Sequence, residues 1–382
     1  MSWKTSIEPA LLRQYPHSSA EQLLEAHAYA YGGAIMPDIG YSPFGSMIYT
    51  DFVHNVRTGD YVQALIEEAE NLNEMAFALG SLAHYMADNY GHLLATNVSV
   101  PLVYPKVKKA FGNSVTYAEH SKSHSRMELS FDVLQTARGN YVSKDYHDFI
   151  GFKVAIPVVE KAFFRTYGLD VNSVFKSLPV AISTYRWTIK FLLPNIVRTA
   201  WASKKSELKL ANPGLTARKF AYKMNNRAYY HEFGKDHQKA GFFPTVIGFL
   251  MPVLPKVGPL SKLRFRPPTP EVENLFIKSF DTTLVYYESA LRTIGIKPLR
   301  FPNKALDTGL ETTLGSYSIA DCSYAELLEA LEEQKFENVS LNVRNSMVQF
   351  FSSGNKPELK RRKDKKRRAE IYASYDRLLK SL

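Results

Sequence analysis

The chain has 382 residues, 45% of them apolar and 13% aromatic, so it can bury a large core or form more than one domain. Its single cysteine, Cys322, excludes a disulfide framework and a cysteine zinc site, so a metal would have to be bound by His, Asp and Glu. The run Lys360–Arg368 holds eight basic residues and one acidic residue, and supplies +7 of the net charge of +11. Such a run is typical of a solvated helix face or a loose tail, with attraction to anionic lipid or nucleic acid as the alternative.

Helical patterns dominate the chain and alternating strand patterns are scarce, which predicts an all-α fold: a multi-helix bundle with a helical C-terminal extension. The first helix is expected to begin at a capping box, Ser18–Glu21, and to stop at Gly32–Gly33. We expect Asp38 on a loop, because it directly follows Pro37. Further helices are expected, in chain order, at residues 75–97, 118–137, 143–167, 171–204 with a bend near Pro194, 271–294, 323–334 and 339–351.

Three side chains that can bind a metal, His84, Asp88 and His92, stand four residues apart in the predicted helix 75–97. This spacing places them on one helix face, about 6 Å apart at each step. The segment is otherwise apolar, and a buried row of two imidazoles and a carboxylate is costly unless a cation binds it. The row therefore predicts a metal site.

Neighbouring segments offer further ligands. His54 follows Asp38 by sixteen residues, and His124 and Glu128 repeat the spacing of four on the next helix. A single pair of this kind is more typical of a helix salt bridge. Taken together, the side chains exceed what one tetrahedral zinc ion needs, and they predict two or three ions sharing Asp88 as a bridge. The candidate ligands are Asp38, His54, His84, Asp88, His92, His124 and Glu128.

The order of these residues, with the sequence Gly33-Ala-Ile-Met-Pro-Asp38 at its start, resembles the zinc-dependent phospholipase C family, which is related to single-strand zinc nucleases. Residues 80–97 also resemble the catalytic part of glycosylphosphatidylinositol-specific phospholipase D. The resemblance covers roughly residues 20–135. It implies an all-α fold in which zinc ions hydrolyse a phosphodiester. One ion would be held by Asp38, His54, His84 and Asp88, and another by His92, His124 and Glu128.

The resemblance also implies a third ion, toward which Asp88 would bridge and which relatives hold with an N-terminal tryptophan and a nearby histidine. Trp3 and His17 are the only candidates here, and Trp3 is not terminal. We therefore expect the true start, with a leader for export to the periplasm or the outside, to lie upstream of Met1. If Met1 is the true start, a cytoplasmic protein is expected instead.

The expected function is a zinc-dependent, phospholipase C-like phosphodiester hydrolase in which the cations activate water. Asp38 is the candidate that orients or deprotonates this water. The expected substrate is a phospholipid or a similar phosphodiester, with peripheral contact to an anionic membrane. A zinc nuclease with the same cluster is one alternative, since nucleic acid would also agree with the basic charge. A non-catalytic, metal-stabilised protein that binds membrane surfaces is the other.

Shifts in composition divide the chain into three regions: a metal-binding helical catalytic domain at 1–212, a basic and aromatic helical continuation packed on it at 213–300, and a small helical appendage with the basic run at 301–382. In the middle region, residues 218–230 are expected to fill a core with their aromatics or to bind nucleic acid. The apolar segment Phe242–Leu254, broken by two prolines, is expected to be core or to insert into a surface.

Overall fold

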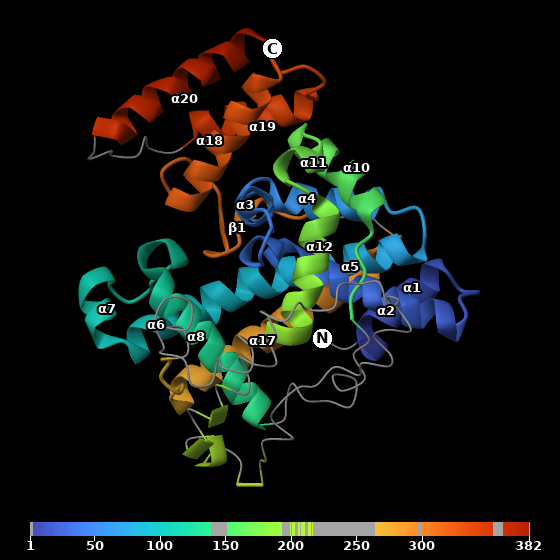
Figure 1. The fold of residues 1–382 in the computed structure, drawn as a ribbon, viewed down its shortest axis with the longest axis vertical. Helices are drawn as coiled ribbons and strands as arrows, with labels where there is room; N and C mark the ends of the chain where they lie inside the picture. Colours follow the sequence, from blue (N-terminus) through green and yellow to red (C-terminus); the bar gives the residue numbers. More distant parts are fainter. Residues whose placement is uncertain are drawn as a thin grey trace.

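The structure, a computed structural model, describes residues 3–138, 151–192, 264–296, 300–353 and 362–381, together with scattered residues between 199 and 216. The regular elements of the described part are helices apart from one short hairpin, which confirms the predicted all-α fold (Figure 1). The N-terminal helices are η1 Trp3–Ile7, α1 Glu8–Gln14, α2 Ala20–Ile35, η2 Met36–Tyr41, α3 Met47–Asn55, α4 Thr58–Glu67, α5 Leu72–Gly91, η3 His92–Thr96, α6 Asn97–Val103, α7 Pro105–Phe111 and α8 Tyr117–Arg138. The later elements are α10 Ile156–Tyr167, α11 Val171–Val174, α12 Leu178–Trp187, η4 Thr188–Leu192, α17 Pro270–Thr293, β1 Lys304–Ala305, β2 Leu310–Glu311, α18 Ser318–Glu333, α19 Leu341–Ser352 and α20 Arg362–Lys380.

Helices α2 and α5 form the closely packed centre of the site region. The predicted capping box is present one residue later, with Ser19 and Gln22 exchanging hydrogen bonds of 3.2 and 2.8 Å. The predicted stop at Gly32–Gly33 is wrong, because α2 continues to Ile35. These glycines serve close approach instead: a Cβ on Gly33 would lie 1.8 Å from the carbonyl oxygen of Phe77 on α5, and one on Gly80 would lie 2.0 Å from that of Ala30 on α2.

Replacing Gly80 by Ala is therefore expected to force α2 and α5 apart. The added carbon would collide with main chain, which cannot rotate away as a side chain can, so the free energy of unfolding should fall by about 3 kcal/mol. Gly91, on the same helix, is the matched control, because a Cβ there meets nothing within 4 Å. Gly91→Ala should leave stability unchanged or raise it by about 0.5–1 kcal/mol. Urea unfolding of both variants measures the difference, and equal effects would contradict this packing.

Several predicted helices differ in their bounds. Helix 75–97 begins earlier, at Leu72, and after Gly91 it passes through the π-helical turn η3 into α6. The helix predicted at 143–167 is wrong over residues 151–155, which are not helical before α10 begins. The continuous helix predicted at 171–204 is also wrong, because extended residues 175 and 177 separate α11 from α12. Pro194 lies outside the described residues.

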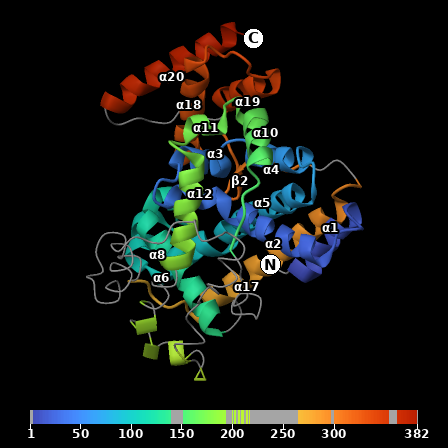
Figure 2. The same cartoon turned by 45° about the vertical axis from the view of Figure 1, so that its right-hand side comes forward.

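Elements of the C-terminal half pack back on the first half. Helix α17, predicted at 271–294, lies against α5, where the Tyr287 hydroxyl donates to the Leu79 carbonyl oxygen at 2.9 Å. Helix α18 packs against α3, and Tyr324 shares an apolar core with Phe52. In both views α18, α19 and α20 lie together at one end of the molecule (Figures 1 and 2). The division into three regions stays a prediction.

The segments predicted to contact lipid or nucleic acid are only partly described. Residues 218–230 and Phe242–Leu254 lie outside the described residues. The basic run enters α20 at Arg362, and Lys366 and Arg367 are exposed there, as on a solvated helix face. Among the described residues, no helix combines the length and apolar character needed to cross a membrane.

Candidate metal centre

Five elements, two of them continuous with each other, bring the seven candidate ligands together. Helix α5 and the first residue of η3 carry His84, Asp88 and His92, so the row predicted from the spacing continues across the end of the regular helix. Asp38 lies in the 3₁₀ helix η2, which corrects the predicted loop: Pro37 is accommodated in the first turn, where its missing N–H is not needed. The other three ligands, His54, His124 and Glu128, come from the last turn of α3 and from α8.

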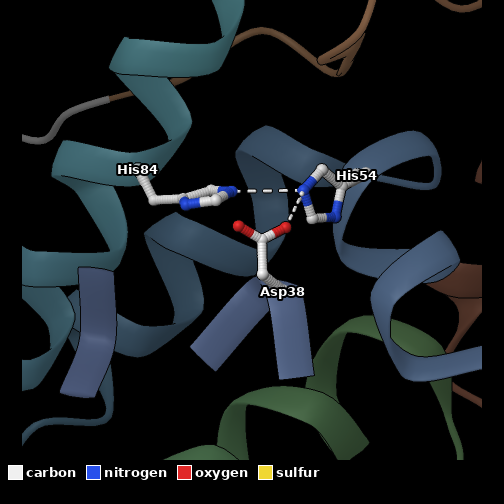
Figure 3. Close-up of side chains that lie close together, drawn as sticks. All are labelled: Asp38, His54 and His84. Atoms are coloured by element: carbon white, nitrogen blue, oxygen red, sulfur yellow. Dashed lines mark hydrogen bonds and ion pairs between the residues drawn. The ribbon is translucent and has the colours of Figure 1, made fainter. Parts of the chain in front are cut away.

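The first group consists of Asp38, His54 and His84, whose ligand atoms all lie within 4.8 Å of one another. His54 Nε2 lies 3.5 Å from Asp38 Oδ1 and 3.1 Å from His84 Nε2, so the three side chains converge on one point (Figure 3). The imidazoles are buried, with about 8% and 9% of their side chains exposed, whereas the Asp38 carboxylate is 44% exposed. The group is thus open to solvent on the side of Asp38.

The second group consists of His92, His124 and Glu128, which meet the same distance criterion. Glu128 Oε1 lies 3.1 Å from His124 Nδ1 and 3.7 Å from His92 Nδ1. The two imidazole rings stack with centroids 5.0 Å apart. One carboxylate therefore faces two imidazole nitrogens, a donor set that suits zinc.

Asp88 lies between the two groups. Its Oδ2 atom is 3.2 Å from His84 Nε2 and 3.4 Å from His54 Nε2, while Oδ1 is 3.9 Å from His92 Nε2. One oxygen thus faces the first group and the other faces the second. This is the arrangement of a carboxylate that can bridge two cations.

The hydrogen bonds of the first group fix which nitrogens are available to a metal. His54 Nδ1 lies 2.8 Å from the Thr50 carbonyl oxygen and His84 Nδ1 lies 2.9 Å from that of Ala34. A carbonyl oxygen only accepts, so in each ring the proton sits on Nδ1 and donates to it. In the neutral rings the two Nε2 lone pairs then face each other at 3.1 Å. That contact is repulsive unless a proton or a metal ion lies between them, and two inward-facing imidazole nitrogens are a donor set that fits a metal ion.

In the second group, hydrogen bonds likewise fix which nitrogen of His124 is available to a metal. The Asn97 amide donates from Nδ2 to the Asp307 carbonyl oxygen at 2.7 Å, which turns its Oδ1 toward His124 Nε2 at 2.9 Å. His124 therefore donates from Nε2 and leaves Nδ1 as an acceptor facing Glu128. Within the described part of the chain, the buried Nδ1 atoms of His92 and His124 have no hydrogen-bond partner. His124 Nδ1 is thus a buried acceptor directed at a carboxylate, and a zinc ion or a proton between the two would satisfy it.

In the metal-free protein, the carboxylates of the site raise the pKa values of the neighbouring histidines. Burial lowers the pKa of His54, but hydrogen bonds to the carboxylates of Asp38 and Asp88 outweigh it and raise that pKa well above its ordinary value. The pKa values of His84 and His92 are raised as well, since Asp88 outweighs the effect of burial. Burial raises the pKa of Asp88, but the histidines outweigh it and lower that pKa well below its usual range. Without metal, the three histidines thus hold their protons to higher pH, and Asp88 stays ionised to lower pH, than the same groups do in water.

Zinc binding should therefore release protons, because a ligating imidazole must be neutral. We expect zinc affinity to increase with pH between about 6 and 8. Calorimetric titration of the metal-free protein with zinc, in two buffers of different ionisation enthalpy, measures the protons released. An apparent enthalpy that is the same in both buffers would contradict the protonated state described above.

The same pKa shifts determine how the metal-free protein responds to pH. Folding raises the three histidine pKa values above the ordinary 6.5. Their stabilisation is complete below pH 6.5 and is lost as the pH rises through the raised values.

Three further histidines of the described part lie outside the two ligand groups. His27 stacks between Trp3 and Tyr31, with ring centroids 4.3 and 4.5 Å apart. His17 lies exposed in the turn after α1. His120 has non-helical backbone angles that kink α8, and its Nδ1 accepts from the Ser123 amide at 3.2 Å. A third ion near Trp3 stays a prediction.

Two residues that orient a candidate ligand were not predicted from the sequence. Asn97 fixes the orientation of His124, and the main chain of Asp307 fixes that of Asn97. Asn97 stands five residues after His92, and only the π-helical turn, which leaves no clear pattern in a single sequence, places it there. Asp307 is 210 positions further along the chain, so no local pattern could have linked it to the site.

Comparison with known proteins supports the family resemblance. The family model of zinc-dependent phospholipase C matches residues 6–177, which contain all seven candidate ligands. No curated protein and no solved structure matched the chain in the other two comparisons.

Proposed function

We propose that the protein is a phospholipid-cleaving phosphodiester hydrolase that uses two zinc ions or more, from the premise that residues 6–177 match the zinc-dependent phospholipase C family. The observation that carries the proposal is the pair of facing Nε2 atoms of His54 and His84, with Asp88 directing one oxygen to each ligand group. Neighbouring divalent cations held there would polarise the phosphoryl group and lower the pKa of water toward neutrality. The role of each ligand is part of the proposal.

Asp38 is the residue we propose to act on the attacking water. Of the first group, its carboxylate is the one exposed to solvent, and it contacts His54 through one oxygen. It can therefore orient a water molecule and accept its proton as the water oxygen bonds to phosphorus and the bond to the leaving alcohol oxygen breaks. The leaving oxygen takes up a proton, which completes hydrolysis to an alcohol and a phosphomonoester.

A membrane substrate is supported by the segment that follows Asp38. Four apolar side chains there expose between 42% and 70% of their surface: Tyr41, Phe44, Met47 and Ile48. The segment is held in place by two hydrogen bonds to main chain, from Ser46 Oγ to Val174 at 2.6 Å and from Thr184 Oγ1 to Pro43 at 2.5 Å. Fixed, exposed apolar side chains beside a catalytic group suit contact with a lipid surface more than with nucleic acid. Export from the cytoplasm stays a prediction.

The decisive test combines metal analysis of the purified protein with a substrate panel of phosphatidylcholine, phosphatidylinositol and single-stranded DNA. We expect zinc in the protein, and release of diacylglycerol that stops on chelation and returns when zinc is restored. Cleavage of DNA alone would support the nuclease alternative. Chelation that unfolds the protein, without turnover of any diester when zinc is present, would support a metal-stabilised binding protein instead.

A further inference from the structure

A pocket of about 400 Å³ lies beside the first ligand group, with His84 in its wall. Helices α2, α5 and α17 and the N-terminal η1 enclose it. Helix α17 lies outside the residues that match the family model, so one side of this pocket is built by a part of the chain that the match does not cover. The volume falls within the range of small-molecule sites.

The wall of the pocket is mainly apolar. Its side chains on α5 and on the elements facing it include Ile7, Ala83, Ala87, Phe276, Phe280 and Leu284. The two wall hydroxyls on α17 are already used within that helix: Ser279 donates to the Phe276 carbonyl oxygen at 2.8 Å and Thr283 to that of Ser279 at 2.9 Å. These hydroxyl protons are therefore not directed at a ligand, and an apolar occupant loses little there.

Three of the aromatic rings in the wall do not offer a slot for a nucleic-acid base. Trp3, His27 and Tyr31 are stacked on one another at 14° and 21°, with centroids less than 5 Å apart. The faces between these rings are thus already covered, whereas base recognition by stacking needs an open face. A flexible hydrocarbon chain, by contrast, can pack against ring edges and aliphatic side chains.

We propose that this pocket binds a hydrocarbon chain of the substrate while the phosphate lies at the ligand groups. The position of the phosphate rests on the proposed function. The position of the hydrocarbon chain rests on the apolar wall beside His84. Gly91 is the position at which this proposal can be tested. It lines the pocket, and there is open space where a Cβ would lie. Its backbone angles of −63° and −49° are helical, so other residues can adopt them. A leucine at this position would project into the space that the chain is to occupy.

The experiment compares a chainless choline phosphodiester with monomeric phosphatidylcholines of increasing chain length. In the wild type, kcat/KM should rise by up to about fourfold with each added methylene that enters the pocket. In Gly91→Leu, the ratio of long-chain to chainless kcat/KM should fall at least about tenfold. The ratio is the readout because a disturbance of the neighbouring His92 affects both substrates alike. Ile277→Ala, on α17 outside this pocket, should keep the wild-type ratio.

Binding of 1-decanol, measured by calorimetry, separates the pocket from the chemistry. We expect binding to the wild type and to Ile277→Ala, and at least about tenfold weaker binding to Gly91→Leu. If no diester is cleaved but decanol binding depends on Gly91 in this way, the proposed function fails and the pocket stands. If Gly91→Leu binds decanol as the wild type does, or keeps the wild-type dependence on chain length, the pocket proposal is overturned.

Discussion

Replacing Asp88 by Asn is expected to remove both bound zinc and turnover. Asp88 is the described carboxylate that reaches both ligand groups, within 3.4 Å of His54 and His84 and at 3.9 Å from His92. An amide keeps the shape but loses the negative charge and leaves one oxygen in place of two. We expect zinc content to fall by about one ion or more per chain and turnover of a soluble diester to fall at least about 10³-fold. Elemental analysis and a chromogenic substrate measure the two effects.

The matched control for this change is Asp281→Asn, an Asp to Asn replacement at an exposed position on α17. It should keep wild-type zinc content and activity. Thermal unfolding of the metal-free proteins provides a second comparison, since it tests whether Asp88→Asn still folds. Full zinc content together with wild-type turnover in Asp88→Asn would show that Asp88 does not bridge the two groups.

The central part of the site could be predicted because helix geometry is periodic. His84 and Asp88 are four residues apart on α5, and His124 and Glu128 are four apart on α8, so sequence spacing alone predicts that each pair shares a face. The family resemblance placed Asp88 in the first group, whereas the structure places it between the two groups, and the other six residues fall into the groups that the resemblance implies. Their function as metal ligands is still a prediction, which the replacements and the metal analysis test.

The parts that could not be predicted depend on tertiary packing. Gly32 and Gly33 are read locally as a helix end, yet α2 continues because the main chains at Phe77 and Lys153 lie against them. Asp38 is read as a loop residue because it follows proline, yet proline also suits the first turn of a short helix. Intrinsic propensity is a weak guide where neighbouring elements decide the outcome.

The second large effect is expected at Asp38, where Asn should abolish turnover but leave the fold and most of the zinc in place. The carboxylate is 44% exposed and lies 3.5 Å from His54, whereas the imidazole pair of the first group is held by main-chain hydrogen bonds that do not involve Asp38. The remaining ligands should therefore keep their positions. The amide cannot accept the proton of the attacking water, and we expect turnover to fall by about 10²–10⁴-fold.

Comparing Asp38→Asn with Asp88→Asn separates proton transfer from metal binding. In the Asp38 variant, the zinc content should stay close to that of the wild type while kcat falls, and KM for a soluble diester should change little. In the Asp88 variant, zinc and kcat should fall together. If Asp38→Asn loses zinc in proportion to its loss of activity, Asp38 acts as a metal ligand and a different group receives the proton. Wild-type turnover in Asp38→Asn would exclude both roles, because neither a proton acceptor nor a carboxylate ligand would remain at that position.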